Sequence, residues 1–309
     1  MSNRPRWGLQ FLFIFFAAFT PSAAAHENGL RAELSSDGNE IQVFRAGDQP
    51  PLVTQIARPD FRPYLHPIAA PDGKGVLTEF SPGHHRHQTG LYWGFTRVNG
   101  RDYFHHPEGT YWKRVSASIL NAVTTSPEDG IQWKTVYHLL DGKGQPILEE
   151  SQTWTLFDQG ATYYMDLNWQ GKALTDVTIG KYKYGGLFLR MPWKPGMNGE
   201  VFSSARQTNK RAEGQRAVWV DVGIQVPGRD NLAHIAIFDH PSNKGFPQPW
   251  RVDGQMGVGP VRARMGDWQI KMGETETIRH RVFVHTGALD DVRLTKHWSS
   301  YSGQRMASA

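Results

Sequence analysis

Hydrophobic and polar residues alternate along most of this 309-residue chain, as they do in strands with one buried face. The segment IQWKTVYHLL at 131–140 is the clearest example. The others alternate in the same way or are rich in β-branched and aromatic residues, and they lie at 40–46, 150–157, 161–169, 217–223, 233–240 and 277–285. We therefore predict strands over most of the chain.

Turn-forming clusters separate these segments, among them SDGN, PDGKG, PEDG, DGKGQ, PGMNG and PSNKG. Many strands at short spacing predict an all-β fold, a large antiparallel β-sandwich or barrel. Only GALDDVRLTKHW at 287–298 has a helical pattern, which predicts a short C-terminal helix. The sequence holds no repeat and no interdomain linker, so a single domain over 26–309 is the simplest interpretation.

The first 25 residues have the pattern of a secretory signal peptide. Arg4 and Arg6 precede an apolar run, and Ala23 to Ala25 form a small-residue cleavage site. Cleavage there predicts a mature chain that begins at His26 and is periplasmic or secreted. No other segment reaches the roughly 20 apolar residues of a membrane span, so we expect none.

Charge and cysteine content narrow the function classes. Loss of Arg4 and Arg6 lowers the formal net charge from +5 to +3, a modest balance that argues against a nucleic-acid partner. The chain has no cysteine, which excludes disulfides, thiolate metal sites and a cysteine nucleophile. Its 11 tryptophans suit packing between sheets and are also compatible with a carbohydrate partner, because indole rings stack on sugars. The oligomeric state is not indicated.

The segment SPGHHRHQTGLYWG at 81–94 places His84, His85 and His87 within four positions. If residues 85–95 are extended, His85 and His87 share a face with Trp93. That spacing suits two imidazoles binding one divalent metal, and it equally suits hydrogen-bonding residues in a polar loop. The candidates for a third ligand are His66, Glu79, His105 and His240.

Seven motifs occur in the order found in the PmoA-like family, often labelled "methane oxygenase PmoA". They are RPYLHPI, PDG, PGHHRHxxGLYWG, VNGRDYFH, GGxxxR, AVWVDVG and FDHPSN, and together they cover about residues 40–285. The chain therefore resembles exported bacterial proteins associated with sugar-processing genes. The methane label itself does not fit, since a membrane monooxygenase subunit needs spanning helices.

The resemblance implies a set of site residues and a fold. The family pattern falls on His66, His85, His87, Arg190, Asp239 and His240 as catalytic candidates. The candidates for substrate contact are Trp93, Lys183, Tyr184 and Trp219. Two positions depart from the pattern, because His84 replaces an aspartate and Gln88 a histidine. By analogy, the fold resembles the galactose-mutarotase supersandwich.

Three functions are compatible with these residues. The first is a carbohydrate lyase or glycoside hydrolase that uses histidine acid–base chemistry on oxidised or decorated sugars. The second is a glycan-binding module without catalysis. The third is a copper oxidase in which an N-terminal His26 would chelate the ion. For Arg190 we expect either a substrate carboxylate as partner or a structural salt bridge with Glu79, Asp221 or Asp239.

Overall fold

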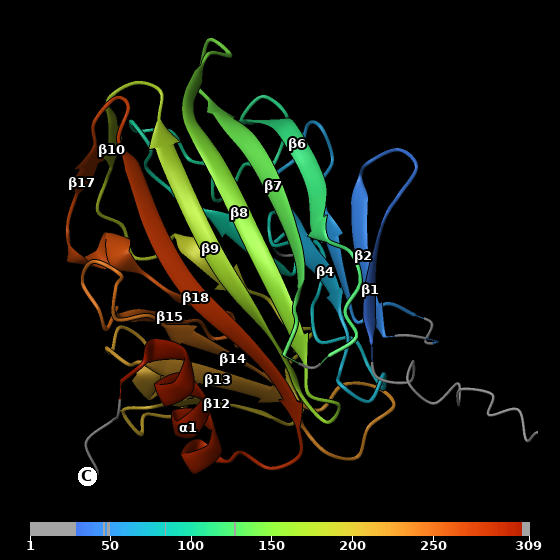
Figure 1. Cartoon of the computed structure of the whole chain (residues 1–309). Coiled ribbons are helices and arrows are strands. Elements are labelled where there is room, and N and C mark those ends of the chain that lie inside the picture. Colours follow the sequence, from blue (N-terminus) through green and yellow to red (C-terminus); the bar gives the residue numbers. More distant parts are fainter. Residues whose placement is uncertain (1–28, 46, 48–49, 84, 127, 305–309) are drawn as a thin grey trace, which may run out of the picture.

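The computed structural model describes residues 29–304 except 46, 48, 49, 84 and 127. The predicted signal peptide, His26 and His84 lie outside the described residues. The rest forms two large antiparallel sheets and one helix, α1 (Asp291–Ser302), which confirms the predicted all-β sandwich with a short C-terminal helix (Figure 1). No helix within the described residues has the length and apolar character that a membrane span requires.

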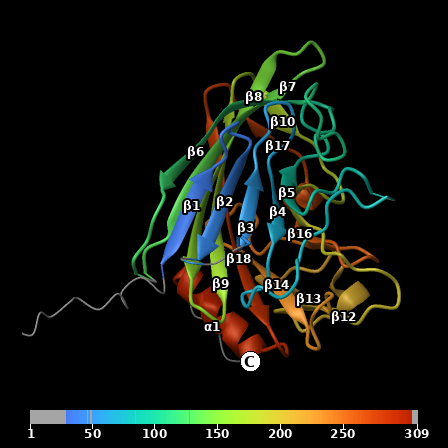
Figure 2. The same ribbon diagram turned by 90° about the vertical axis from the view of Figure 1, so that its right-hand side faces the viewer.

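Each large sheet contains eight strands. The order in the first sheet is β1 (Leu30–Leu34), β2 (Glu40–Arg45), β3 (Val53–Ile56), β4 (Tyr64–Ile68), β5 (Leu91–Gly94), β11 (Gly186–Leu189), β16 (Val258–Pro260), β15 (Trp250–Val252). The order in the second is β12 (Gly199–Ser203), β13 (Trp219–Ile224), β14 (Ala233–Asp239), β18 (Thr275–Thr286), β9 (Tyr163–Ala173), β8 (Pro146–Asp158), β7 (Ile131–Leu140), β6 (Trp112–Asn121). A small pair joins β10 (Val177–Ile179) to β17 (Trp268–Ile270). Figure 2 shows the first sheet in front of the second.

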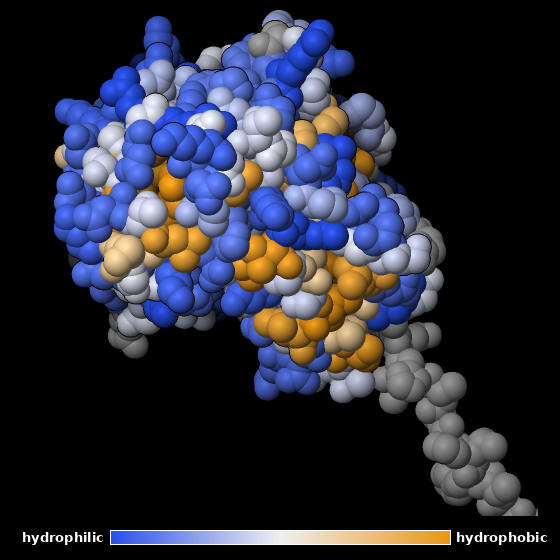
Figure 3. All heavy atoms as spheres, turned by 90° about the horizontal axis from the view of Figure 1, so that it is seen from above, coloured by the Kyte–Doolittle hydropathy of each residue, from blue (hydrophilic) through white to orange (hydrophobic). Residues whose placement is uncertain are grey.

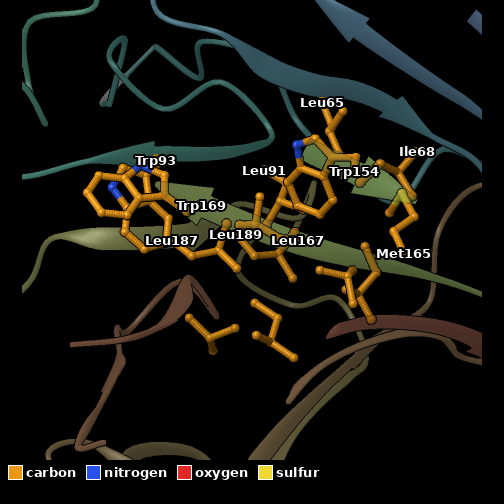
Figure 4. Close-up of a cluster of buried hydrophobic side chains, with 14 of the residues drawn as sticks. Leu65, Ile68, Leu91, Trp93, Trp154, Met165, Leu167, Trp169, Leu187 and Leu189 are labelled. Carbon is orange, nitrogen blue, oxygen red and sulfur yellow. The ribbon is translucent and has the colours of Figure 1, made fainter. Parts of the chain in front are cut away.

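The main hydrophobic core lies between the two large sheets and draws side chains from both. Trp93 of β5 stacks on Trp169 of β9 with ring centroids 4.8 Å apart, so the two sheets meet through these indoles (Figure 4). Leu91 and Leu187 of the first sheet and Leu167 of the second pack in the same layer. Aromatic side chains bury about 150–250 Å² each, which makes this stack a large part of the core.

Successive side chains of β5 point to opposite faces of the first sheet. Trp93 points inward, so its neighbour Tyr92 points to the outer face, where it packs with Tyr64, Phe104 and Phe188. This outer aromatic cluster is the floor on which the candidate site is built.

The helix covers the outer face of the second sheet. Leu294 and Trp298 of α1 pack against Trp219 and Phe283 of that sheet. The Asp290 side chain caps the helix by accepting a hydrogen bond from the Arg293 N–H at 2.9 Å. The helix begins at Asp291 and ends at Ser302, a few residues later than the predicted 287–298.

Apolar side chains also reach the surface. Seen from above, the molecule is mostly hydrophilic, with apolar patches across its middle that are densest toward the lower right (Figure 3). The exposed large apolar side chains include Val115 and Leu120 of the edge strand β6 and Val123 just after it. The candidate site described below uses none of these residues.

Candidate functional site

Two loops bring three histidines together beside the outer face of the first sheet. The His85 and His87 rings lie 5.7 Å apart between centroids, and the His105 ring lies 4.6 Å from that of His87. The predicted strand over 85–95 is wrong in its first part, because β5 begins only at Leu91. A turn precedes it, in which the His85 N–H donates to the Pro82 carbonyl at 2.8 Å. The turn, and not strand alternation, brings His85 and His87 together.

These histidines line a pocket with a volume of about 170 Å³. Its walls come from both loops, from β11 and the segment before it, and from β15 and the residue after it. The lining residues are His85, His87, Gln88, Phe104, His105, Lys183, Tyr184, Phe188, Arg251 and Asp253.

Arg62 holds the two histidine loops to each other from below. Its side chain is fully buried, and its guanidinium lies 3.8 Å from the centre of the Tyr92 ring. Nη2 donates to the His87 carbonyl at 2.6 Å, and Nη1 donates to the Phe104 carbonyl at 2.7 Å. One cation thus fixes the backbone of both loops at the residues that carry the site.

Asp102, His105 and Tyr184 form a hydrogen-bonded chain that ends in the pocket. Asp102 Oδ2 lies 2.7 Å from His105 Nδ1, and His105 Nε2 lies 3.1 Å from the Tyr184 hydroxyl. An ionised carboxylate only accepts, so Nδ1 carries a proton, and in the tautomer with its single proton on Nδ1 the Nε2 atom accepts from the Tyr184 hydroxyl. The same order of carboxylate, imidazole and hydroxyl activates the nucleophile in catalytic triads.

The pKa shifts indicate the protonation states of Asp102, of Tyr184 and of the neighbouring His87. Burial tends to raise the pKa of Asp102, but hydrogen bonds from the His105 side chain and N–H outweigh it, so that pKa is below its usual range. Burial raises the pKa of the Tyr184 hydroxyl. Burial, with the nearby His105, Arg62 and His85, lowers the pKa of His87 to about 3. Asp102 is therefore ionised at neutral pH, whereas Tyr184 and His87 are neutral.

The pocket carries an excess of positive charge. Lys183 and Arg251 are cations in its wall, and Lys183 has no carboxylate within salt-bridge distance among the described residues. Asp253 is the lining carboxylate, and its Oδ2 accepts from Arg190 Nη2 at 3.1 Å. Asp253 is therefore paired with Arg190, and Arg251 is paired with Glu213, which leaves Lys183 as the wall cation available to an anionic ligand.

Arg190 lies behind the pocket wall, where it is 1% exposed. Nε donates to the Gln88 amide oxygen, Nη1 to the Gln255 carbonyl and Nη2 to Asp253. Arg190 thus forms a structural salt bridge, one of the two roles that we expected from the sequence. Its partner is Asp253 and not one of the three acids named there. Gly186, at φ +106°, lies close to Pro260, because a Cβ atom there would be 3.4 Å from the Pro260 carbonyl oxygen. We assign Arg190 to positioning Gln88 and Asp253.

Besides Arg190, three of the predicted catalytic residues do not line this pocket. His66 Nδ1 lies 2.9 Å from the Thr78 hydroxyl, and its ring packs near Phe80. Asp239 is buried at the end of β14, where it accepts from the Asn243 side chain and the Gln248 N–H. His240 follows it and packs against Tyr301 beside α1. Asp239 and His240 therefore belong to the second sheet and its helix.

The predicted substrate contacts divide in the same way. Lys183 and Tyr184 line the pocket, whereas Trp93 and Trp219 are 2% and 1% exposed. Trp93 belongs to the core between the sheets and Trp219 to the cluster beneath α1, so neither ring is available to stack on a sugar.

Sequence reasoning missed Asp102, Arg251 and Asp253. The Asp102-x-x-His105 spacing is a usable local signal, because Asp102 Oδ1 also accepts the Phe104 and His105 N–H groups. Arg251 and Asp253 carry no such signal, since they reach the pocket through the pairing of β15 with β16 and of β16 with β11.

A second histidine cluster lies in the second large sheet and shares no residue with the pocket. Asp221, His234 and His285, on neighbouring strands of the second sheet, bring ligand atoms within 4.8 Å of one another, the one such group found among the described residues. His234 Nδ1 lies 2.7 Å from Asp221 Oδ2, and its Nε2 lies 3.0 Å from the Gly287 carbonyl. Both neighbours are acceptors, so both nitrogens of His234 donate and the ring is an imidazolium. Hydrogen bonding accounts for this cluster without an ion.

The pocket offers a metal two imidazoles, those of His85 and His87. Both nitrogens of His105 are already engaged by Asp102 and Tyr184, so His105 is not a third ligand in this arrangement. A divalent metal at His85 and His87 stays a prediction.

Comparison with known proteins places the chain in a family. No curated protein matches it in sequence. The GH36 alpha-galactosidase AgaB from Geobacillus stearothermophilus is similar in structure with a TM-score of 0.44 and 10% identity, over 83% of this chain and 41% of that one. The alpha-galactosidase from Lactobacillus brevis gives a TM-score of 0.39 and 9% identity, over 88% of this chain and 41% of that one.

This chain thus spans about two fifths of the length of those two enzymes, and at these TM-scores the likeness carries no argument about activity. The matching family model makes no reference to PmoA or to methane oxidation. The PmoA-like resemblance therefore stays a prediction. The family model matches residues 32–299, and the chain therefore belongs to the family of unknown function DUF6807.

Proposed function

We propose that this protein is a carbohydrate lyase that cleaves a uronate-bearing sugar by β-elimination. One observation carries the proposal: the hydrogen-bonded chain from Asp102 through His105 ends at the Tyr184 hydroxyl inside a pocket walled by Lys183 and Arg251. The chain of hydrogen bonds supports proton transfer, and the two cations suit a ligand carboxylate.

In the proposed reaction, the substrate carboxylate lies against Lys183 and Arg251. Their charge stabilises the enolate-like anion that forms when the carbon next to the carboxylate loses its proton. Because burial raises the pKa of Tyr184, a free tyrosinate is disfavoured. The Tyr184 proton therefore moves to His105 Nε2 as Tyr184 accepts the proton from carbon, and Asp102 stabilises the resulting imidazolium.

The electron pair of the broken C–H bond then forms the C=C bond, and the glycosidic C–O bond breaks. Tyr184 gives the proton to the leaving oxygen and recovers its own from His105. One hydroxyl can serve both steps when the hydrogen and the leaving oxygen lie on the same face of the ring. His85 and His87 remain as hydrogen-bonding groups for the substrate hydroxyls or carboxylate.

Elimination fits this pocket better than hydrolysis does. Glycosidases use two carboxyl groups about 5–9.5 Å apart, one on each side of the scissile bond. Among the described lining residues the carboxyl group is that of Asp253, and it is paired with Arg190. The proposed chemistry therefore relies on tyrosine and histidine.

The other sequence-based functions remain as alternatives to be tested. A glycan-binding module would bind the same sugars and release no product. A metal at His85 and His87 would add to the stabilisation of the carboxylate, and removal with a chelator followed by addition of the metal tests that role. Export after cleavage at Ala25, which the His26 copper site requires, is tested by the N-terminal mass of protein purified from the cell envelope.

The experiment is to incubate the protein with oligomers of glucuronate, galacturonate, mannuronate and guluronate and to follow the ultraviolet absorbance of the conjugated double bond. Tyr184→Phe and His105→Ala should each lose about 10²–10⁴ in kcat/KM, the usual contribution of a positioned acid or base. His106→Ala is the matched control, since His106 is the next residue but stacks on Tyr111 outside the pocket. Binding without any unsaturated product would refute the lyase and leave the binding module.

A further inference from the structure

We infer that the pocket continues into a second subsite that binds the next uronate ring of an acidic oligosaccharide. This inference rests on the proposed function, because it takes the substrate to be a uronate. A groove with a volume of about 450 Å³ shares Arg251 and Asp253 with the pocket. Val201, Lys210, Glu213, Gly254 and Met256 are among the other residues that line this groove, which we call the outer groove.

The boundary between the two cavities is a fixed wall. Arg251 Nη1 donates to Glu213 Oε1 at 2.9 Å, and the Val252 N–H donates to Glu213 Oε2 at 2.6 Å. Arg264 Nη2 donates to the same Oε1 atom from the other side. With its carboxylate held by three donors, Glu213 keeps Arg251 in place, so a chain that crosses the wall meets a preorganised guanidinium.

The sizes of the two cavities suit a chain of sugars. A volume of 170 Å³ lies below the roughly 300–1,000 Å³ of ordinary ligand pockets, whereas 450 Å³ lies within that range. The inner pocket therefore encloses little more than the reacting ring. The outer groove has room for a further ring, and Arg251 lies at the junction between the two.

The lining of the outer groove matches the two kinds of surface on a uronate ring. Val201 and Met256 offer apolar contact for the C–H face of a pyranose. Lys210, in the short helix η2 (Asn209–Ala212), is exposed at the same groove and has no carboxylate within salt-bridge distance in the described part of the chain. Its ammonium group is thus available for the carboxylate of the second ring.

Gly254 provides a way to block the outer groove alone. A Cβ atom at this position would have no heavy atom within 4 Å, and its φ lies outside the left-handed region. Gly254→Trp should therefore fill the groove without strain. Gly142→Trp is the matched control, because Gly142 lies in the turn after β7, where a Cβ would meet only Arg101 Nη1 at 3.8 Å.

The test is calorimetric binding to the full chain with Tyr184→Phe, which should turn over the substrate about 10²–10⁴ times more slowly than wild type. The ligands are chains of one, two and three rings from glucuronan, galacturonan and alginate. We expect two rings to bind about tenfold more tightly than one, as one additional charge-assisted contact provides. Gly254→Trp or Lys210→Glu should remove this gain and change one-ring binding less than about twofold, whereas Gly142→Trp should change neither.

Equal affinity for one and two rings, or a gain that survives Gly254→Trp, would overturn the second subsite. Binding that follows this pattern in a wild-type protein that forms no unsaturated product would support the subsite and refute the lyase. Absence of binding by any of these chains would overturn the subsite and the uronate ligand together. A lyase active on two-ring chains and unaffected by Gly254→Trp would overturn the subsite alone.

Discussion

Arg62 donates a hydrogen bond from Nη2 to the backbone carbonyl of His87 at 2.6 Å. The same guanidinium reaches the Phe104 carbonyl, so it holds the loop of His87 against the loop of His105. The candidate site therefore depends on a residue that is fully buried and does not line the pocket. Burial lowers the pKa of Arg62 to about 10, which still leaves it charged at neutral pH.

We predict that Arg62→Met lowers the free energy of unfolding by about 2–4 kcal/mol, because the buried Phe104 carbonyl and the partly buried His87 carbonyl lose their donor. Urea unfolding measures this loss. Arg97→Met is the control, since Arg97 is exposed and its guanidinium lies over the Tyr182 ring. The milder Arg62→Lys keeps a charge but cannot span both carbonyls, so kcat/KM on the active uronide should fall more than stability does. Unchanged stability in Arg62→Met would mean that other contacts hold the two loops.

A second prediction concerns the buried cluster of Asp221, His234 and His285. Burial tends to raise the pKa of Asp221, but the His285 and His234 imidazoles lower it below its usual range. Burial tends to lower the pKa of His234, but the Asp221 carboxylate and the Gly287 carbonyl raise it above its usual range. Asp221→Asn should cost about 3–5 kcal/mol, because it leaves a buried imidazolium without its partner. Asp230→Asn, at an exposed position, is the control.

The pH dependence of this cluster has two limbs. The contribution of His234 is fully present below its unfolded pKa and is lost as pH rises through its higher folded pKa. The contribution of Asp221 is fully present above its unfolded pKa and is lost as pH falls through its lower folded pKa. The cluster therefore stabilises the protein most between about pH 4 and pH 6.5. Chemical unfolding at a series of pH values measures the free energy of unfolding, and in Asp221→Asn it should vary less with pH on both limbs. Identical pH profiles for the variant and the wild type would contradict a protonated His234.

A third prediction comes from Glu150, which points from β8 into the core between the sheets. Burial raises its pKa to about 7, so the carboxyl group is neutral in the folded protein under mildly acidic conditions. A raised carboxyl pKa costs stability as pH rises above the unfolded value, and the cost levels off above the folded value. Glu150→Gln should thus stabilise the protein by about 3 kcal/mol at pH 8 and by less than about 1 kcal/mol at pH 5.

Glu149→Gln provides the matched control for this measurement. Glu149 is the next residue of β8 on the opposite face, where it is partly exposed beside His138. Thermal unfolding of both variants at the two pH values separates burial from the loss of a charge alone. Equal effects at the two positions would show that Glu150 is not held neutral by burial.

Local sequence patterns predict most of the strands because each strand of a sandwich buries one face. The segments at 131–140 and 233–240 correspond to β7 and β14 almost residue for residue. Periodicity fails at 85–90, where a turn brings His85 and His87 together, since turn geometry follows from backbone hydrogen bonds and not from alternation. The extended segment predicted over 85–95 was wrong at its start, but the prediction that His85 and His87 lie together is confirmed.

The remainder of the candidate site could not be predicted from local patterns. His66 and Asp239 lie within two of the quoted motifs, yet neither lines the pocket. His66 contacts Thr78, and strand pairing places Asp239 in the second sheet. Arg251 reaches the pocket from a strand more than 140 residues away from His105, through contacts that no spacing encodes. Non-local sheet pairing therefore determines which charged residues meet in the pocket.

The last prediction separates the core from the site within a single strand. Trp93 and Tyr92 are neighbours in β5, but Trp93 stacks on Trp169 between the sheets and Tyr92 lies beneath the pocket. Trp93→Ala should lower the free energy of unfolding by about 3–5 kcal/mol, the usual cost of removing a large core side chain. Should that variant fail to fold, Trp93→Phe gives a smaller loss from the same cause. In either folded variant, the Kd for the active uronide should stay within about twofold of wild type, because no indole atom reaches the ligand. A Trp93→Phe protein with unchanged stability and much weaker sugar binding would instead place Trp93 in the binding site, as the sequence alone had indicated.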